Sequence, residues 1–497
     1  MVCSAGPNGS PGLSMTTRTG LPLPPWARRP SGAGAIVASF LLAALLLLGH
    51  LRPWRTLEFS TWPSGYEAGR IARNLDAGLG YMSPFVALPG DNFLSSEPGS
   101  PHAGTARPAI QNAAPGDWPT AWITPPYVLL WYLPFHLFGA YTAAAAAAYQ
   151  IVQVALIGFA LGLAWVLVRR VHGPDAATWA LIFLVLYPST WYFALEDTHG
   201  TALFVVLLLL SLVTLGRLFE PDAGTGARVT HGLSVALAVL TEPSSLLFFA
   251  WLEGWAAWRL RRGSRQSARR LLTATALSCV AVLGPWLGRN LADLRAPVLL
   301  KSNLSMELFY GNNPEAGEDA FVAHVHRFPA WSEEERLRLL EIGEPAYARL
   351  CFERAVGFME SSPLATLVLS VRRFIYYWSF NPDRVLPWRP LLTLIFNLVL
   401  GLWLFSTASL GRRRLVWLDH ACIAFFALFP IAYYATQFMI YRYRYPLEVL
   451  LLIAAAASMT RALDGGSPDG AAPGSRAVSA AGEILPAARR TGPEPAR

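Results

Sequence analysis

Charge is scarce in this chain of 497 residues: 14% of its residues are charged, 54% are hydrophobic, and the mean hydropathy is +0.36. So few charged side chains cannot cover the surface of a soluble globule of this size. Apolar runs of roughly 20 residues, enough to cross a hydrocarbon layer of about 30 Å, recur along almost the whole sequence. The composition therefore excludes a large soluble domain and predicts an all-α polytopic membrane protein.

Cysteine and lysine are also rare. The four cysteines, Cys3, Cys279, Cys351 and Cys422, have neither paired nor metal-ligand spacing, and two of them lie inside apolar runs. This pattern excludes a disulfide framework and a cysteine metal site. Lys301 is the only lysine, which we attribute to genomic base composition without a mechanistic role. We attribute the net charge of +8 to arginines that set the orientation of the chain in the membrane, and we expect no nucleic-acid partner.

Ten membrane spans are predicted, with the N-terminus on the cytoplasmic side. They lie near residues 34–50, 142–168, 174–190, 199–216, 230–242, 244–258, 271–287, 388–408, 415–436 and 445–460. In this arrangement the arginine-rich loops after the second, fourth, sixth and eighth spans all fall inside, as the positive-inside bias requires. The first span lacks a small-residue cleavage pattern after it, which indicates a retained anchor. The fifth and sixth spans are short enough to form a hairpin that only partly crosses.

The same topology divides the chain into a membrane domain and two tails. Residues 1–33 are predicted to be a disordered cytoplasmic N-terminus, residues 34–461 the membrane domain, and residues 462–497 a disordered cytoplasmic tail. Two long segments of the membrane domain lie outside: residues 51–141, which contain interfacial helices, and residues 288–387. The outer surface of the protein therefore carries most of its non-membrane sequence.

A polar amphipathic helix is predicted directly after the first anchor, in "GYEAGRIARNLDAGLGYMSPF" (65–85). On a helical wheel the small and apolar residues of 66–78 share one arc. Glu67, Arg70 and Asn74, at spacings of three and four, share an edge that we expect to face water or a cleft. A solvated face with a Glu67–Arg70 pair is the alternative interpretation.

Further acidic, basic and amide side chains are predicted at the same external boundary. They are Glu196, Asp197, Arg289, Asn290, Asn312, Asn313, Arg442 and Arg444. Arginines at the outer boundary run against the charge bias and need a reason; they either snorkel to lipid phosphates or bind a phosphate as substrate. In "YRYRYPLE" (441–448), alternating Arg and Tyr offer planar, multidentate donors to phosphate. Acids beside phosphate-type donors indicate a group-transfer site.

The order of these segments resembles the GT-C superfamily of integral-membrane glycosyltransferases, in particular the branch of the protein O-mannosyltransferases and the aminoarabinose transferase of lipid A (glycosyltransferase family 39). The motifs compared are Ile71-Ala72-Arg73, Pro125-Pro126-Tyr127, Pro285-Trp286 with Arg289-Asn290, Gly311 to Pro314, and Arg442 to Pro446. The resemblance covers roughly residues 35–460. It departs at the acidic motif, where the family's usual Asp would fall on Ser64 and the nearest carboxylate is Glu67.

The resemblance implies an enzyme that moves a sugar from a polyprenyl phosphate to an acceptor hydroxyl at the outer face of a bacterial inner or plasma membrane. Glu67 would be the base, and Glu196 or Asp197 would support the acceptor or a divalent metal. The substrate and its phosphate would be bound by Arg70, Arg289, Asn290, Asn312, Asn313, Arg442 and Arg444. No histidine–carboxylate cluster at ligand spacing demands a metal, and the sugar and the acceptor, whether protein, lipid or glycan, are left open.

Two other functions fit parts of the pattern. A transporter or flippase for lipid-linked sugars would grip phosphate with the same cationic boundary, although the spans hold few of the central charges that a transport path needs. A non-catalytic cell-envelope protein fits if Ser64 marks a lost catalytic acid. The enzyme interpretation requires that Glu67 and Arg442, far apart in the chain, approach each other.

Overall fold

The computed structural model describes residues 29–51, 66–86, 114, 116–317, 327–329, 332–379, 394–401, 403, 415–436 and 441–463. Helices dominate these residues, and the only β-contact among them is an isolated bridge between Met82 and Pro119. The predicted all-α class is therefore confirmed. The two predicted disordered tails lie almost entirely outside the described residues, so those predictions stay untested.

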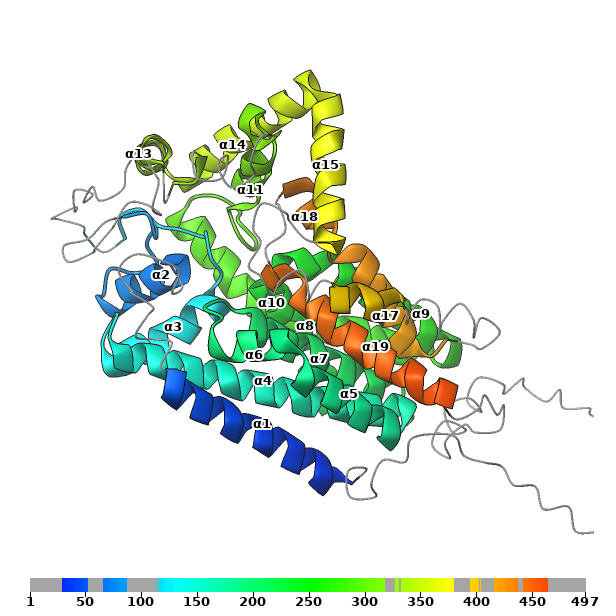
Figure 1. Ribbon diagram of the computed structural model, residues 1–497. Helices are drawn as coiled ribbons and strands as arrows, with labels where there is room; N and C mark the ends of the chain where they lie inside the picture. Colours follow the sequence, from blue (N-terminus) through cyan, green and yellow to red (C-terminus); the bar gives the residue numbers. More distant parts are fainter. Residues whose placement is uncertain are drawn as a thin grey trace, which may run out of the picture.

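In the described part of the chain, ten labelled helices and the helical residues 394–401 and 403 pack into the bundle (Figure 1). The labelled helices are α1 (Pro30–Leu51), α4 (Ala143–His172), α5 (Pro174–Leu186), α6 (Pro188–Leu195), α7 (Thr201–Leu218), α8 (Thr225–Thr241), α9 (Leu246–Gly263), α10 (Arg265–Asp293), α17 (Trp417–Leu428) and α19 (Tyr445–Leu463). They share one large apolar core in which leucine, alanine and phenylalanine side chains are buried. Burial of this apolar surface between helices orders the bundle, and van der Waals packing is the main attraction between helices in lipid.

Within the described ranges, five helical segments are long and apolar enough to cross a membrane, and the bent α5–α6 pair would be a sixth. The predicted third span is this pair, which bends by 61°. Pro188 causes the break, because proline has no backbone N–H to continue the hydrogen-bond ladder and restricts the residue before it. Of the predicted eighth span only residues 394–401 and 403 are described, so the count of ten stays a prediction.

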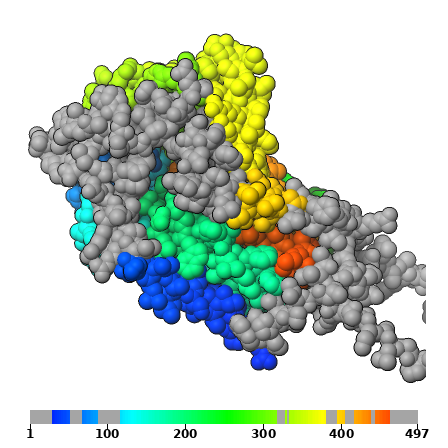
Figure 2. All heavy atoms as spheres, in the orientation of Figure 1, coloured from blue at the N-terminus to red at the C-terminus, as the bar shows by residue number. Residues whose placement is uncertain are grey.

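A second group of helices covers one side and one end of the bundle. It comprises α2 (Tyr66–Asp76), α3 (Pro125–Phe138), α11 (Leu304–Gly311), α13 (Glu333–Ile342), α14 (Glu344–Ser361), α15 (Pro363–Trp378) and α18 (Ile431–Thr436). Figure 2 shows α15, in yellow, standing above the bundle on the side opposite α1. The helices α2, α3, α11 and α14 enclose a smaller apolar core of their own. All these helices except α18 belong to the two segments predicted to lie outside.

Local sequence signals explain the ends of these outer helices. Ser332 caps α13, accepting a hydrogen bond from the backbone N–H of Glu335 at 3.4 Å, as the Ser–Glu spacing predicts. Gly343 ends the helix with φ of 80°, a left-handed conformation that glycine adopts without steric cost. The helical prediction for 66–78 is also confirmed, with α2 spanning Tyr66–Asp76.

Candidate functional site

Glu67, in the first turn of α2, is positioned by the packing of that helix. Ala68, Ile71 and Ala72 are fully buried in the smaller core and hold α2 against α3. The Glu67 carboxylate accepts a hydrogen bond from the indole N–H of Trp122. Burial raises the pKa of Glu67, whereas the bond from Trp122 and the charges of Arg442 and Lys301 lower it. The carboxylate therefore lies beside two cations that come from distant parts of the chain.

The polar edge of α2, expected to face water or a cleft, is not open to water beyond Glu67. Arg70 and Asn74 are buried. Arg70 donates to the carbonyl of Pro84 at 3.2 Å, and Asn74 donates to the carbonyl of Met82 at 3.2 Å. These side chains fasten the chain after α2 back onto the helix, because buried carbonyls need donors. Arg70 is therefore left out of the phosphate site proposed below.

The turn between α6 and α7 separates the two predicted acids. Glu196 is exposed, whereas Asp197 is 2% exposed and its Oδ1 lies 3.2 Å from Nδ1 of His199. The other oxygen, Oδ2, is buried and has no hydrogen-bond partner among the described residues. Burial and the charge of Arg442 lower the pKa of His199, while Asp197 raises it. The structure thus favours Asp197 over Glu196 as the inward acid and gives it a histidine partner.

Arg442 lies in the short 3-10 helix η5 (Tyr441–Tyr443) that leads into α19. Its Nη2 donates to the hydroxyl of Tyr443 at 2.7 Å, and its guanidinium carbon is 4.7 Å from the centre of that ring. Its Nε is buried and lacks a hydrogen-bond partner in the described part of the chain. A guanidinium N–H that no protein group accepts from is able to donate to an anionic ligand.

Tyr127, in the first turn of α3, marks the point where these segments meet. Its hydroxyl donates to the carbonyl of Thr198 at 2.8 Å. Burial raises its pKa strongly, and the same group is influenced by Arg442, Asp197, Glu67 and Tyr443 in that order. Residues from α2, the α6–α7 turn and η5 are therefore within electrostatic reach of one hydroxyl. Glu67 and Arg442 converge as the enzyme interpretation requires.

The sequence analysis missed two members of this group, Lys301 and Glu307. Burial and the neighbouring Glu67 raise the pKa of Glu307, on α11, to about 8, while Arg442 and Lys301 lower it. The ammonium of Lys301 makes neither an ion pair nor a hydrogen bond with any residue that the structure describes. Lys301 therefore lies within electrostatic reach of Glu67 and Glu307, which its rarity in the sequence did not predict. The sequence feature that could have pointed to Lys301 is its position directly before the "SNLSMELFYGNNP" segment.

Arg289 is committed to the protein's own backbone instead of facing outward. Its Nη1 donates to the carbonyl of Thr120, its Nη2 donates to the carbonyl of Tyr81 at 2.8 Å, and its Nε pairs with Asp293 at 2.9 Å. The loops that carry these carbonyls lead into Trp122 and α3. Arg289 therefore holds the loop that presents Trp122 to Glu67, and we do not include it among the phosphate ligands.

Arg444 differs from Arg442 although only one residue separates them. Its side chain is fully buried, its Nε pairs with Glu448 at 2.9 Å, and its Nη1 donates to the carbonyl of Ser379 at 3.0 Å. Successive residues of the turn point in different directions, so one arginine joins the convergent group and the other ties α19 to the end of α15. Of the two arginines predicted to bind phosphate, only Arg442 lies in the convergent group, and phosphate binding by either stays a prediction.

The predicted asparagines also serve the backbone. Each is buried, and each side-chain amide donates to a carbonyl: Asn290 to Val298 at 2.7 Å, Asn312 to Leu308 and Ala435 at 2.8 Å, and Asn313 to Phe309 and Tyr310 at 3.0 Å. They fix the loops around α10 and α11. The expectation that they bind substrate gains no support from these contacts.

A divalent metal was also considered for this group. Within the described residues, no three His, Cys, Asp or Glu side chains lie close enough together to hold a metal ion. The carboxylates near Glu67 are accompanied by Arg442 and Lys301. No step proposed below passes through a metal.

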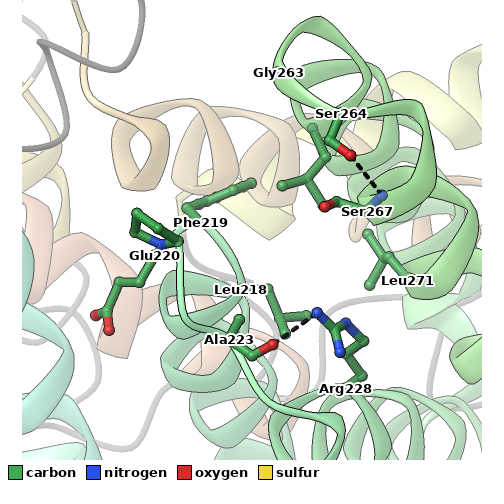
Figure 3. Close-up of a pocket in the computed structure, with 11 residues that line it drawn as sticks. Leu218, Phe219, Glu220, Ala223, Arg228, Gly263, Ser264, Ser267 and Leu271 are labelled. Carbon is green, nitrogen blue, oxygen red and sulfur yellow. Dashed lines mark hydrogen bonds between the residues drawn. The ribbon is translucent and has the colours of Figure 1, made fainter.

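A cavity of about 160 Å³ lies away from this group, between the α7–α8 turn and the α9–α10 turn (Figure 3). Leu218, Phe219 and Leu271 form much of its wall. Arg228 reaches it but donates to the carbonyl of Ala223 at 2.7 Å. Both turns are cytoplasmic in the predicted topology, so this cavity is at the opposite end of the bundle from Glu67.

No protein-family model matches the chain, and no curated protein matches its sequence. Two solved structures do match. The crystal structure of ArnT from Cupriavidus metallidurans bound to undecaprenyl phosphate has 15% identity and a TM-score of 0.35, covering 85% of this chain and 78% of that one. The apo structure has 15% identity and a TM-score of 0.34, covering 86% and 78%. At TM-scores this low, nothing about reaction or site is carried over from ArnT.

Proposed function

We propose that the protein is a glycosyltransferase that moves a sugar from a polyprenyl phosphate to an acceptor hydroxyl at the extracytoplasmic face of the membrane. The observation that carries the proposal is the convergence of Glu67 with Arg442 and Lys301. A carboxylate beside two cations with unfilled bonding capacity suits a reaction that takes up a proton and releases a phosphate. The membrane bundle supplies the surface on which a lipid donor presents its head group.

In the proposed reaction the acceptor oxygen attacks the anomeric carbon of the sugar while the bond from that carbon to the phosphate oxygen breaks. The electron pair of the broken bond leaves with polyprenyl phosphate, and the hydroxyl proton passes to Glu67. General-base assistance of this kind contributes about 100- to 10,000-fold. Trp122 orients the carboxylate, and the neighbouring cations favour its ionised form.

Arg442 and Lys301 are assigned to the phosphate. A guanidinium offers several N–H donors in one plane, and an ammonium adds a compact charge that can follow the leaving group. Glu307, with a pKa of about 8, is largely protonated at neutral pH. It can therefore donate a hydrogen bond near the phosphate without adding a repelling charge.

The test uses the full-length protein in lipid nanodiscs, with undecaprenyl phosphate carrying labelled mannose or glucose. Release of undecaprenyl phosphate together with transfer of the label to an added membrane extract is the expected result. Glu67→Gln should reduce turnover at least 100-fold, because an amide cannot take up the proton. Glu334→Gln is the control, since Glu334 is an exposed acid on the surface of α13 that pairs with Arg338 at 3.3 Å.

Full turnover by Glu67→Gln would remove the base assignment. Movement of labelled donor across proteoliposomes, without any sugar transfer, would replace the enzyme by the transporter. Failure of the wild-type protein both to bind and to turn over a polyprenyl phosphate sugar would favour the non-catalytic cell-envelope protein.

A further inference from the structure

Glu242 stands at a break in the bundle that the sequence analysis did not connect with any site. It caps the C-terminus of α8 and is followed by the short helix η2 (Pro243–Ser245), after which α9 begins. Pro243 ends the helix, because the residue before a proline is disfavoured in the α conformation. The predicted topology places this break at the outer end of the bundle, on the same side as Glu67.

The contacts of Glu242 use only one of its two carboxylate oxygens. Oε1 accepts hydrogen bonds from the hydroxyl of Ser244 at 2.8 Å and from the hydroxyl of Tyr433 at 3.2 Å. These two hydroxyls also lie 2.7 Å from each other. Oε2 makes no hydrogen bond within the described residues, and the side chain is only partly buried. A carboxylate is therefore held in place by two hydroxyls while one oxygen stays available.

Stacked tyrosine rings connect Glu242 to Arg442. The ring of Tyr433 stacks on that of Tyr443 with centres 4.2 Å apart and planes 23° apart. The hydroxyl of Tyr443 accepts the hydrogen bond from Arg442 described above. Burial raises the pKa of Tyr443 to about 12, Arg442 lowers it, and both Glu307 and Glu242 raise it. Tyr443 is therefore within electrostatic reach of Glu242, Arg442 and Glu307.

We propose that Glu242, Tyr433 and Tyr443 form a carbohydrate subsite beside the phosphate-binding Arg442. This proposal rests on the proposed function and specifies where the sugar of the donor lies. In such a donor the sugar is bonded directly to the phosphate, so a phosphate at Arg442 brings the ring hydroxyls next to Tyr443. Oε2 of Glu242 accepts hydrogen bonds from those hydroxyls, while Tyr433 holds the carboxylate in place and Tyr443 holds Arg442 beside it.

The experiment compares the affinities of two probes, undecaprenyl phosphate and undecaprenyl phosphate mannose, for the full-length protein in nanodiscs. The wild-type protein should bind the mannose-bearing lipid more tightly than the bare lipid. Glu242→Ala should weaken binding of the mannose-bearing lipid about 10- to 100-fold, the loss expected for hydrogen bonds to a charged group. Its affinity for the bare lipid should stay within about twofold of wild type by the same reasoning. Arg442→Ala should weaken the binding of both.

Glu242→Gln keeps the size of the side chain and provides a second variant should Glu242→Ala fold poorly. Its amide oxygen is a weaker acceptor, so we expect a loss of about 3- to 10-fold for the mannose-bearing lipid only. Glu334→Ala is the matched control for the loss of a carboxylate and should change neither affinity. Near-native circular dichroism and thermal midpoints confirm that each variant is folded.

The outcomes separate this proposal from the function on which it rests. Equal weakening of both lipids by the Glu242 variants, or no weakening of either, would overturn the subsite. Equal binding of the two lipids by the wild-type protein would overturn the subsite and leave the phosphate site standing. Absence of binding to both lipids, with the wild-type protein folded, would overturn the proposed function itself.

Discussion

Two polar clusters in this protein have similar residue types but differ in how many of their hydrogen-bond donors and acceptors have partners. Between α7, α8, α9 and α10, His231 lies 2.6 Å from Oε1 of Glu253, and Thr275 donates to Oε2 of Glu253 at 3.0 Å. The other ring nitrogen of His231 lies 3.0 Å from the carbonyl of Ser211. Every polar atom of this inner pair has a partner, so the inner cluster is complete without a ligand.

The outer cluster around Glu67 is different because several of its groups have unused capacity. In the described part of the chain, the ammonium of Lys301, Nε of Arg442 and Oδ2 of Asp197 lack hydrogen-bond partners. Buried polar groups without hydrogen-bond partners lower the stability of a protein, and most such groups are bonded to protein, water or a ligand. The comparison teaches that two clusters with similar residue types can differ in how many of their donors and acceptors are already used by the protein.

The largest expected effect tests the outer cluster. Arg442→Ala should reduce sugar transfer about 100- to 1,000-fold, the cost of removing one preorganised donor to developing negative charge. The thermal midpoint should change little, because Arg442 bonds only Tyr443 within the described residues. Initial rates and differential scanning fluorimetry on the same preparations measure both quantities. Arg338→Ala, which removes a surface arginine of α13, should leave both unchanged.

The next effect tests the inner cluster with the opposite signature. Glu253→Ala leaves His231 and Thr275 without their partner, which should cost about 1–3 kcal/mol of stability for each buried group left unsatisfied. Turnover per folded molecule should stay unchanged, because the pair does not belong to the outer cluster. Thermal midpoints and active-site titration provide the measurements. A selective fall in turnover at unchanged stability would contradict the distinction drawn between the two clusters.

A smaller effect is expected at Lys301. Lys301→Gln should weaken binding of undecaprenyl phosphate about tenfold, because one charged donor to the phosphate is lost. Lys301→Arg should retain most of the affinity, since the positive charge is kept. Neither change should lower the thermal midpoint, as the ammonium has no partner among the described residues. Unchanged binding of undecaprenyl phosphate by Lys301→Gln would show that Lys301 does not bind the phosphate.

The smallest effect concerns pH. The pKa of Glu307 is raised from 4.5 to about 8 in the folded protein, so folding favours its protonated form. Its contribution to stability is complete below pH 4.5 and is lost as pH rises toward 8. As the pH rises from about 5.5 to about 8.5, the thermal midpoint of the wild-type protein should therefore fall more steeply than that of Glu307→Gln. Parallel curves for the two proteins would show that Glu307 titrates normally.

Sequence patterns predicted local structure well wherever neighbouring residues decide it. The amphipathic period predicted α2, and the apolar runs predicted most bundle helices. Arginine placement predicted that Glu67 and Arg442 share one face of the membrane, and the structure brings them together. These features depend on spacing along the chain, on proline and glycine geometry, or on the charge bias across a membrane.

The sequence by itself determined the helical class and the face of the membrane that carries the polar residues. Only the tertiary structure decided which of those residues converge, because distant backbone carbonyls compete for the same donors. Arg70, Arg289 and Arg444 are used up by carbonyls and acids that packing brings near them, whereas Arg442 and Lys301 keep donors free. Residue type states what a side chain can bind, but three-dimensional packing determines whether it is already bound.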